Sequence, residues 1–147
     1  EFILTLEETD FERLEEAGIP RAQVIPQVGK LFLDFGFHAP TVAFPEVFGL
    51  MIEPTESYAK NELDRFAEAV KTIREIIEEC PQALESAPHF TPIDRVDEVA
   101  ANRNLCLHDQ LDHLPSLPFN RVKPSVLKDL SIPEIKKRIL ESVRSEG

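Results

Sequence analysis

The stretch GFHAPT at residues 36–41, followed by LMIEPTE at residues 50–56, indicates how this chain is built. Gly36 is placed to end a helix in the left-handed conformation, and Pro40 then turns the chain into an extended segment. Residues 48–52 form a nearly continuous apolar run that a Glu-Pro pair stops, as is typical of a buried central strand. Polar residues fall where the backbone changes direction. The pattern favours a site displayed at the edge of a small packed domain.

The residues before this stretch predict a strand and a short helix. Residues 1–6 alternate in polarity, which predicts a half-buried strand. The apolar face of this strand consists of Phe2, Leu4 and Leu6. Thr9 and Glu12 fit a capping box, with Thr9 as the cap, and Gly18 is placed to end the helix.

Helical spacing of apolar residues predicts two longer helices, one on each side of the central strand. The first covers residues 22–35, with Pro26 in its first turn, where a missing N–H group costs little. A short edge strand is expected at residues 42–44, because Pro45 follows it. The second helix covers residues 57–79. Its expected buried stripe is Leu63, Phe66, Ala67, Val70, Ile73, Ile76 and Ile77.

The last third of the chain is less regular. Residues 82–86 predict one more helical turn, and residues 94–104 predict a short helix capped by Asp94. Its apolar positions are Val96 and Val99. Prolines interrupt residues 105–124, which we interpret as a linker or wrapping segment. A capping box at Ser131 opens a final amphipathic helix. Its inward positions are Ile135, Ile139, Leu140 and Val143.

This order of elements predicts an α+β fold, with helices on one face of a small antiparallel sheet. The 147 residues are 42% hydrophobic and 29% charged, as expected for one soluble globular domain. The net charge of -11 argues against nucleic acid and anionic membranes as partners. The chain lacks an apolar run of about 18 residues, so no membrane span is expected.

We expect a cytoplasmic location, because no signal peptide is visible and Cys80 and Cys106 fit free thiols in a reducing compartment. The chain begins at Glu1 rather than at Met, so further residues are expected upstream.

His38 and Thr41 are candidate site residues in the turn at residues 36–41. A turn histidine between Phe37 and Ala39 is most often structural, with a ring nitrogen bonded to the backbone. The functional alternative is a histidine that faces a ligand or a partner domain at the domain edge. Thr41 either begins the strand or supplies a hydroxyl to the same site.

Glu53 and Glu56 flank the start of the long helix. Acidic residues there complement the helix dipole, with Thr55 or Ser57 as the cap. The alternative is a pair of carboxylates, fixed between strand and helix, that binds a cationic group.

Other chemical motifs are weak. Two His-Asp pairs, at residues 108–109 and 112–113, have a poor spacing for a preformed metal site, so we favour a solvated polar segment. His89 carries no discernible signal. There is no phosphate loop, no HExxH motif, no nucleophile elbow and no lysine in an apolar pattern. The residues alone indicate no evident catalytic centre.

Several separate motifs, in the right order, resemble the C-terminal part of the glycine cleavage system P-protein, the glycine dehydrogenase (decarboxylating). The similar stretches are EFI (1–3), GFHAPT (36–41), FP (44–45), MIEPTES (51–57), ELDRF (62–66), APH (87–89), TP (91–92) and DEV (97–99). Two features depart from the family: PEVFG at residues 45–49 stands in place of a Pro-Val-Ala-Gly type of loop, and residues 111–147 have no recognised counterpart.

The resemblance implies a fold and a role. The family depends on pyridoxal phosphate, decarboxylates glycine and passes the aminomethyl group to the lipoyl arm of H-protein. Its enzymes have a large cofactor-binding domain and a small C-terminal α+β domain of the aminotransferase-like type. The chain resembles the small domain over residues 1–108. Residues 109–147 would be an irregular linker and helix that extend the same domain.

We therefore expect a C-terminal domain that neither binds pyridoxal phosphate nor catalyses by itself. Its partners would be the P-protein large domain or subunit, with lipoylated H-protein as a further candidate. The residues that would face the active site are His38, Thr41, Glu53, Thr55 and Glu56. A freestanding binding or regulatory module is the alternative. A stand-alone enzyme with His38 as a base is disfavoured, because no second catalytic partner is evident.

Overall fold

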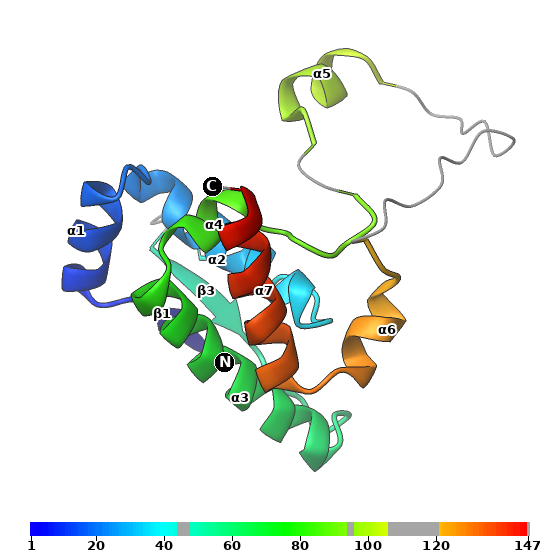
Figure 1. The fold of residues 1–147 in the computed structure, drawn as a ribbon. Coiled ribbons are helices and arrows are strands. Elements are labelled where there is room, and N and C mark those ends of the chain that lie inside the picture. The colour runs from blue at the N-terminus through cyan, green and yellow to red at the C-terminus, as the bar shows by residue number, and fades with distance from the viewer. Residues whose placement is uncertain (44–47, 94–95, 106–120, 147) are drawn as a thin grey trace, which may run out of the picture.

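The computed structural model describes residues 1–43, 48–93, 96–105 and 121–146, in a three-stranded sheet and several helices (Figure 1). The elements are β1 (Phe2–Thr5), α1 (Glu8–Glu16), α2 (Arg21–Asp34), β2 (Thr41–Val42), β3 (Gly49–Ile52), α3 (Lys60–Glu79), α4 (Gln82–Ser86), α5 (Glu98–Arg103), α6 (Pro124–Asp129) and α7 (Ile132–Glu146). The predicted α+β class is confirmed.

The sheet is antiparallel, with strand order β1-β3-β2, so the predicted central strand does lie in the centre. Leu4 pairs with Leu50 on the side that packs into the core, where Leu50 is fully buried. Side chains alternate along a strand, so the other face carries the pair Ile3 and Met51, which are 53% and 39% exposed. Phe2, predicted to be buried, is 50% exposed at the edge of the sheet, because β1 is an edge strand.

The predicted start of α1 is wrong. The helix begins at Glu8 rather than after Thr9. Its N-cap residue is Glu7, and Asp10 is the residue whose side chain closes the capping box. The Asp10 carboxylate accepts the Glu7 backbone N–H at 3.1 Å. Gly18 does end this segment, with a φ of 92° in the left-handed region.

Pro26 is also misplaced in the prediction. Because α2 begins at Arg21, directly after Pro20, Pro26 lies in the second turn of the helix and not in its first. The end of α2 agrees with the prediction, since Gly36 has a φ of 77°.

Helix α3 begins later than predicted, and its buried stripe is displaced at the N-terminal end. Neither Thr55 nor Ser57 caps it; the N-cap is Ala59, whose N–H is accepted by the Glu62 carboxylate at 3.2 Å. Ala69 is buried where Ala67 was expected. Leu63 is 39% exposed and lines a pocket described below.

Helix α5 is shorter than predicted and does not bury its apolar residues. Its cap is Asp97, whose carboxylate accepts the Ala100 N–H at 2.8 Å. Val96 and Val99 are 61% and 60% exposed, so the expected inward positions are wrong. Asp94, expected as the cap, lies outside the described residues.

The C-terminal segment contains a helix that the sequence did not predict. Pro124, predicted to interrupt the chain, is the first residue of α6, where a missing N–H is harmless. Ser131 caps α7 as predicted, since its Oγ accepts the Glu134 N–H at 3.4 Å.

Helix α7 packs against α3 and α4 and completes the core (Figure 1). Ile135 and Ile139 are fully buried, whereas Leu140 and Val143 are half-buried. The Nζ of Lys136 lies 2.8 Å from Glu75 Oε2 and 2.6 Å from Glu79 Oε1, which joins α7 to α3. The C-terminal segment is therefore part of the same packed body as the sheet and α2.

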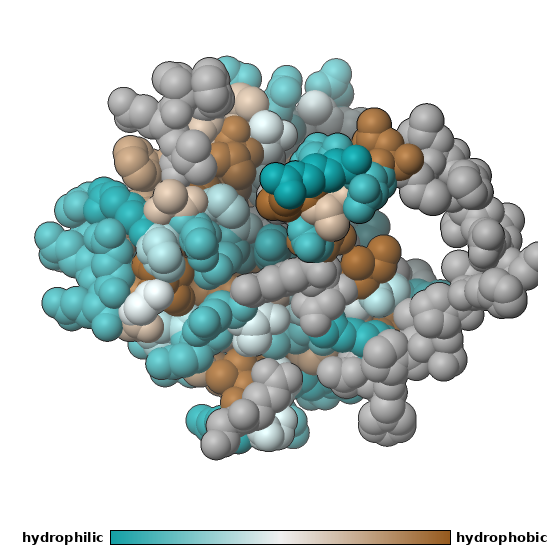
Figure 2. All heavy atoms as spheres, turned by 90° about the horizontal axis from the view of Figure 1, so that it is seen from above, coloured by the Kyte–Doolittle hydropathy of each residue, from teal (hydrophilic) through white to brown (hydrophobic). Residues whose placement is uncertain are grey.

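The surface is mixed in character. On the face shown in Figure 2, hydrophobic patches lie between hydrophilic residues. No helix in the described part of the chain is long and apolar enough to span a bilayer.

Candidate functional site

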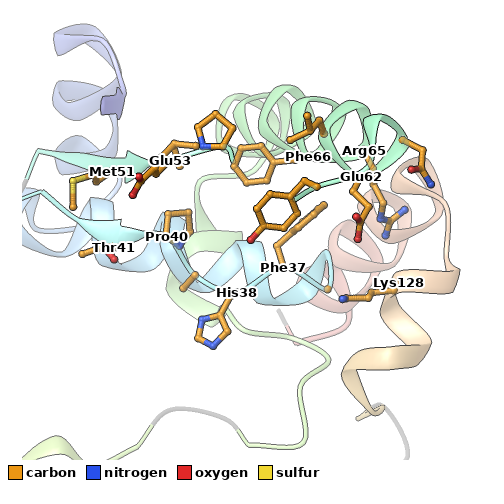
Figure 3. A pocket seen from close by; sticks show the side chains of 17 residues that line it. Phe37, His38, Pro40, Thr41, Met51, Glu53, Glu62, Arg65, Phe66 and Lys128 are labelled. Atoms are coloured by element: carbon orange, nitrogen blue, oxygen red, sulfur yellow. The ribbon is translucent and has the colours of Figure 1, made fainter. Parts of the chain in front are cut away.

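A pocket of about 670 Å³ lies between the turn that follows α2, the end of β3 and the first turns of α3, with α6 at one end (Figure 3). The lining residues are Gly36, Phe37, His38, Ala39, Pro40, Thr41, Met51, Ile52, Glu53, Pro54, Tyr58, Asn61, Glu62, Leu63, Arg65, Phe66 and Lys128. Through Met51 and Thr41, the pocket is continuous with the exposed face of the sheet.

The turn on one side of the pocket has a fixed backbone. The Gly36 N–H donates to Leu33 O at 3.0 Å and the Phe37 N–H donates to Phe32 O at 3.0 Å, which is the Schellman pattern of a helix end. The left-handed Gly36 makes this pattern possible without strain. His38 follows directly and is exposed, so its imidazole is displayed by a rigid turn.

Aromatic rings form the floor of the pocket. Phe66 of α3 stacks on the buried Phe32, with ring centroids 5.4 Å apart. Phe37 meets Phe66 edge to face, with centroids 5.3 Å apart. Such an apolar floor with a few polar groups around it is the usual composition of a ligand pocket.

Arg65 fixes the end of the pocket that α6 borders. Its Nη1 donates to Leu130 O at 2.9 Å, and its Nη2 donates to Phe35 O at 3.3 Å and Leu127 O at 3.1 Å. These carbonyls belong to the ends of α2 and α6, where a cation also complements the helix dipoles. The guanidinium lies 5.9 Å from the centroid of the Phe37 ring. One side chain of α3 thus holds two helix ends together.

The charged residues of the pocket come from separate elements. Glu53 is exposed at the end of β3, Glu62 lies in the first turn of α3, and Lys128 lies in α6. In Figure 3, Glu53 lies at the sheet end of the pocket, whereas Glu62, Arg65 and Lys128 lie at the other end. Glu62 and Arg65 belong to the family-like stretch ELDRF at residues 62–66, but nothing in the sequence places them or Lys128 in one pocket, because their proximity depends on tertiary packing.

Three of the five predicted residues, His38, Thr41 and Glu53, line the pocket, and in Figure 3 the His38 imidazole points away from the aromatic floor. Thr55 and Glu56 are exposed and are not among its lining residues, and Thr55 Oγ1 lies 2.5 Å from Ser57 Oγ. The carboxylate pair that the sequence suggested, Glu53 with Glu56, therefore does not form within the pocket.

A buried polar network lies behind the turn, and the sequence did not predict it. The Asp34 carboxylate, at the end of α2, accepts the His89 N–H at 2.8 and 3.0 Å and the Phe90 N–H at 2.9 Å. His89 Nδ1 lies 2.8 Å from Asp34 Oδ2, and His89 Nε2 lies 2.9 Å from Ser86 Oγ. One signal was available, because Asp34 is an acidic residue in an apolar run of a helix.

The contacts from Ser86 to His89 to Asp34 have the arrangement of a hydrolase catalytic triad, but the network does not open into a pocket where a substrate could reach it. His89 and Asp34 are buried, and neither Ser86 nor His89 is among the lining residues of the pocket. We assign it a structural role: it holds the segment after α4 against the end of α2, directly before the turn that displays His38.

The remaining predictions about sites concern other regions. The two His-Asp pairs at residues 108–109 and 112–113, and Cys106, lie outside the described residues. Within the described ranges, no group of three His, Cys, Asp or Glu residues is arranged to hold a metal ion. Cys80 is a half-buried free thiol.

Comparison with known proteins shows which family has this turn and strand. A family model described as glycine dehydrogenase, C-terminal domain, matches residues 4–89, more than half of the chain. The chain belongs to this family. The matched residues include the His38 turn, Glu53, Glu62 and Arg65, whereas Lys128 lies beyond them.

Relatives from bacteria and archaea carry the same description. The chain is 49% identical over 80 residues to the probable glycine dehydrogenase (decarboxylating) subunit 2 of Chlorobium phaeovibrioides, covering 53% of this chain and 16% of that protein. It is 53% identical over 76 residues to the protein of the same name from Pyrococcus horikoshii, covering 50% of this chain and 15% of that protein. The chain therefore matches about one sixth of the length of these relatives. No solved structure matches it.

Proposed function

We propose that this glycine dehydrogenase C-terminal domain closes over the cofactor site of a decarboxylating glycine dehydrogenase, with the pocket and the exposed sheet face turned toward that site. The large cofactor-binding domain or subunit would be its partner, in an aminotransferase-like arrangement. The full enzyme would decarboxylate glycine and pass the aminomethyl group to the lipoyl arm of H-protein, in the cytoplasm.

One observation carries this proposal. The family-matched residues His38, Thr41 and Glu53 lie around one pocket, and that pocket is continuous with the exposed Ile3 and Met51 of the sheet. An apolar face beside a pocket that has polar groups at its edge is suited to docking against another protein surface. Helix α7 packs on α3 and α4, so it leaves this face of the sheet exposed.

The described residues do not fit pyridoxal phosphate by themselves. The N-terminus of α3 borders the pocket, but the Glu62 carboxylate already accepts the Ala59 N–H there, so this N–H group is not free to bind a phosphate group. Every lysine of the described part is exposed or half-buried, whereas a lysine that forms a Schiff base is usually desolvated. We therefore place the cofactor on the partner domain and derive no step through it.

We also propose a division of the chain. Residues 1–108 would form the family domain, and residues 109–147 would extend it. This division is supported by the burial of Leu127, Ile135 and Ile139 in the same core as α2 and α3.

A hybrid protein tests the proposed function. The 147-residue chain replaces the matched 80-residue segment of the Chlorobium phaeovibrioides subunit 2, and the hybrid is combined with its partner subunit. We expect exchange of the glycine carboxyl carbon with bicarbonate, and none from the isolated chain. A hybrid that assembles and holds the cofactor but shows no exchange would contradict the proposal.

The alternative is a freestanding binding or regulatory module, favoured by the close packing of the C-terminal segment. An isolated chain that retains lipoylated H-protein at tens of micromolar, together with an inactive hybrid, would favour this alternative.

A further inference from the structure

We propose that Lys128 of α6 binds a carboxylate in the pocket, so that the segment beyond the family match supplies a specificity-determining residue. This inference deepens the proposed function and rests on it for the identity of the pocket. The binding of a carboxylate by Lys128 is independent of the proposed function.

Lys128 lies against the turn that displays His38. A Cβ atom at position 36 would lie 2.9 Å from Lys128 Cγ and 3.2 Å from the Lys128 backbone N. The side-chain stem of Lys128 therefore passes over Gly36, where any larger residue would displace it. Arg65 holds the same helix through Leu127 O at 3.1 Å. In Figure 3, the ammonium group of Lys128 points toward the pocket.

The Lys128 ammonium group has no counter-ion among the described residues. No carboxylate of the described chain forms an ion pair with it, although the protein carries a net charge of -11. The two acidic residues of the pocket are placed differently. Glu62 accepts the Ala59 N–H at the positive end of α3, and Glu53 lies at the opposite end of the pocket.

A purely local role explains only part of this arrangement. Lys128 lies in the last turn of α6, where its charge complements the helix dipole. An outward-pointing lysine would serve that role equally well. The ammonium group of this exposed side chain is instead directed toward the pocket in Figure 3, and a carboxylate bound there would gain a charge-assisted hydrogen bond.

Titration of the isolated chain by 15N NMR tests the inference. Two probes separate the two sources of a carboxylate: acetate represents a small acid, and N-acetylglutamate α-amide represents a side chain of a partner protein. Glycinamide, which lacks the carboxylate, is the negative control. We expect saturable shifts of the backbone amides of Phe37 and Ala39 with at least one acid.

Matched variants assign the effect to Lys128. Lys128→Met should weaken the binding of the acid roughly tenfold, the effect of one charge-assisted bond. Lys123→Met removes a positive charge from the other end of α6, at a residue that does not line the pocket. This variant should bind the acid as tightly as the parent protein does. The acid that binds more tightly shows whether the carboxylate comes from a small acid or from a side chain of a partner protein.

The inference would be overturned if no saturable shifts are seen. It would also be overturned if Lys128→Met binds the acid as tightly as the parent protein, or if Lys123→Met weakens binding as much as Lys128→Met. None of these results depends on the hybrid enzyme, so an active hybrid would keep the proposed function while this inference fails. An inactive hybrid with Lys128-dependent binding would show the reverse.

Discussion

At the scale of the residue, the Asp34 carboxylate holds the segment after α4 against the end of α2. It is fully buried and receives backbone N–H groups from His89 and Phe90. Asp34→Ala removes the oxygens that accept these N–H groups and leaves them buried without an acceptor, so we expect a loss of about 3 kcal/mol in the free energy of unfolding. Urea unfolding measures this loss, with the exposed Asp129→Ala as the control. Equal stability of the two variants would contradict the structural role of the network.

Gly36 and Gly18 form a second comparison of single residues. Both have positive φ, 77° and 92°, but a Cβ at position 18 meets nothing within 4 Å, whereas one at position 36 meets Lys128. Gly18→Ala should therefore cost only the backbone strain, about 1 kcal/mol, and Gly36→Ala should cost at least about 1 kcal/mol more. Denaturant unfolding measures both. Equal costs would mean that α6 does not rest on the turn.

At the scale of the element, the ion pairs between α7 and α3 give a pH dependence. Hydrogen bonds to Glu75 and then Glu79 raise the pKa of Lys136 above its ordinary value. Stability from a raised lysine pKa is fully present below the unfolded value, about 10.4, and is lost as the pH rises through the folded value. Lys136→Met should thus cost up to about 1 kcal/mol at pH 7, a difference that shrinks above pH ~10.4. Thermal unfolding across this range measures the difference, and a constant difference would refute the linkage.

The sequence predicted the types of most elements but not their ends. The central strand and α3 were found because each has a long apolar pattern, which tertiary packing preserves. The starts of α1 and α3 were missed because Asp10 and Glu62, inside the first turn, bind the helix end in place of Thr9 and Thr55. Helix α6 was missed because a proline is equally compatible with a helix start and with an interruption.

The candidate site was predicted in part for the same reason. His38, Thr41 and Glu53 flank turns that local chemistry reveals in the sequence. Arg65 and Lys128 come from helices that meet only in the folded chain, and no spacing in the sequence links them.

At the scale of the whole molecule, the C-terminal segment is a structural part of the domain. Leu127, Ile132, Ile135 and Ile139 are buried in the shared core. Each contributes about 1.5–3 kcal/mol by burial, a sum comparable to the entire stability of a domain. A chain that ends at residue 105 should therefore lose cooperative thermal unfolding, as measured by calorimetry. A sharp transition in the shortened chain would show that the family-matched part folds alone.

The proposed orientation of the domain is the central claim, and cross-linking from the turn tests it most directly. In the hybrid subunit 2, a photo-cross-linking residue replaces His38 in one variant and the exposed Glu141 of α7 in another. After borohydride reduction and irradiation, mass spectrometry locates the cross-links relative to the pyridoxyl-bearing peptide. We predict cross-links from position 38, and not from position 141, to segments around the cofactor lysine. Cross-links to those segments from position 141 alone would contradict the claim.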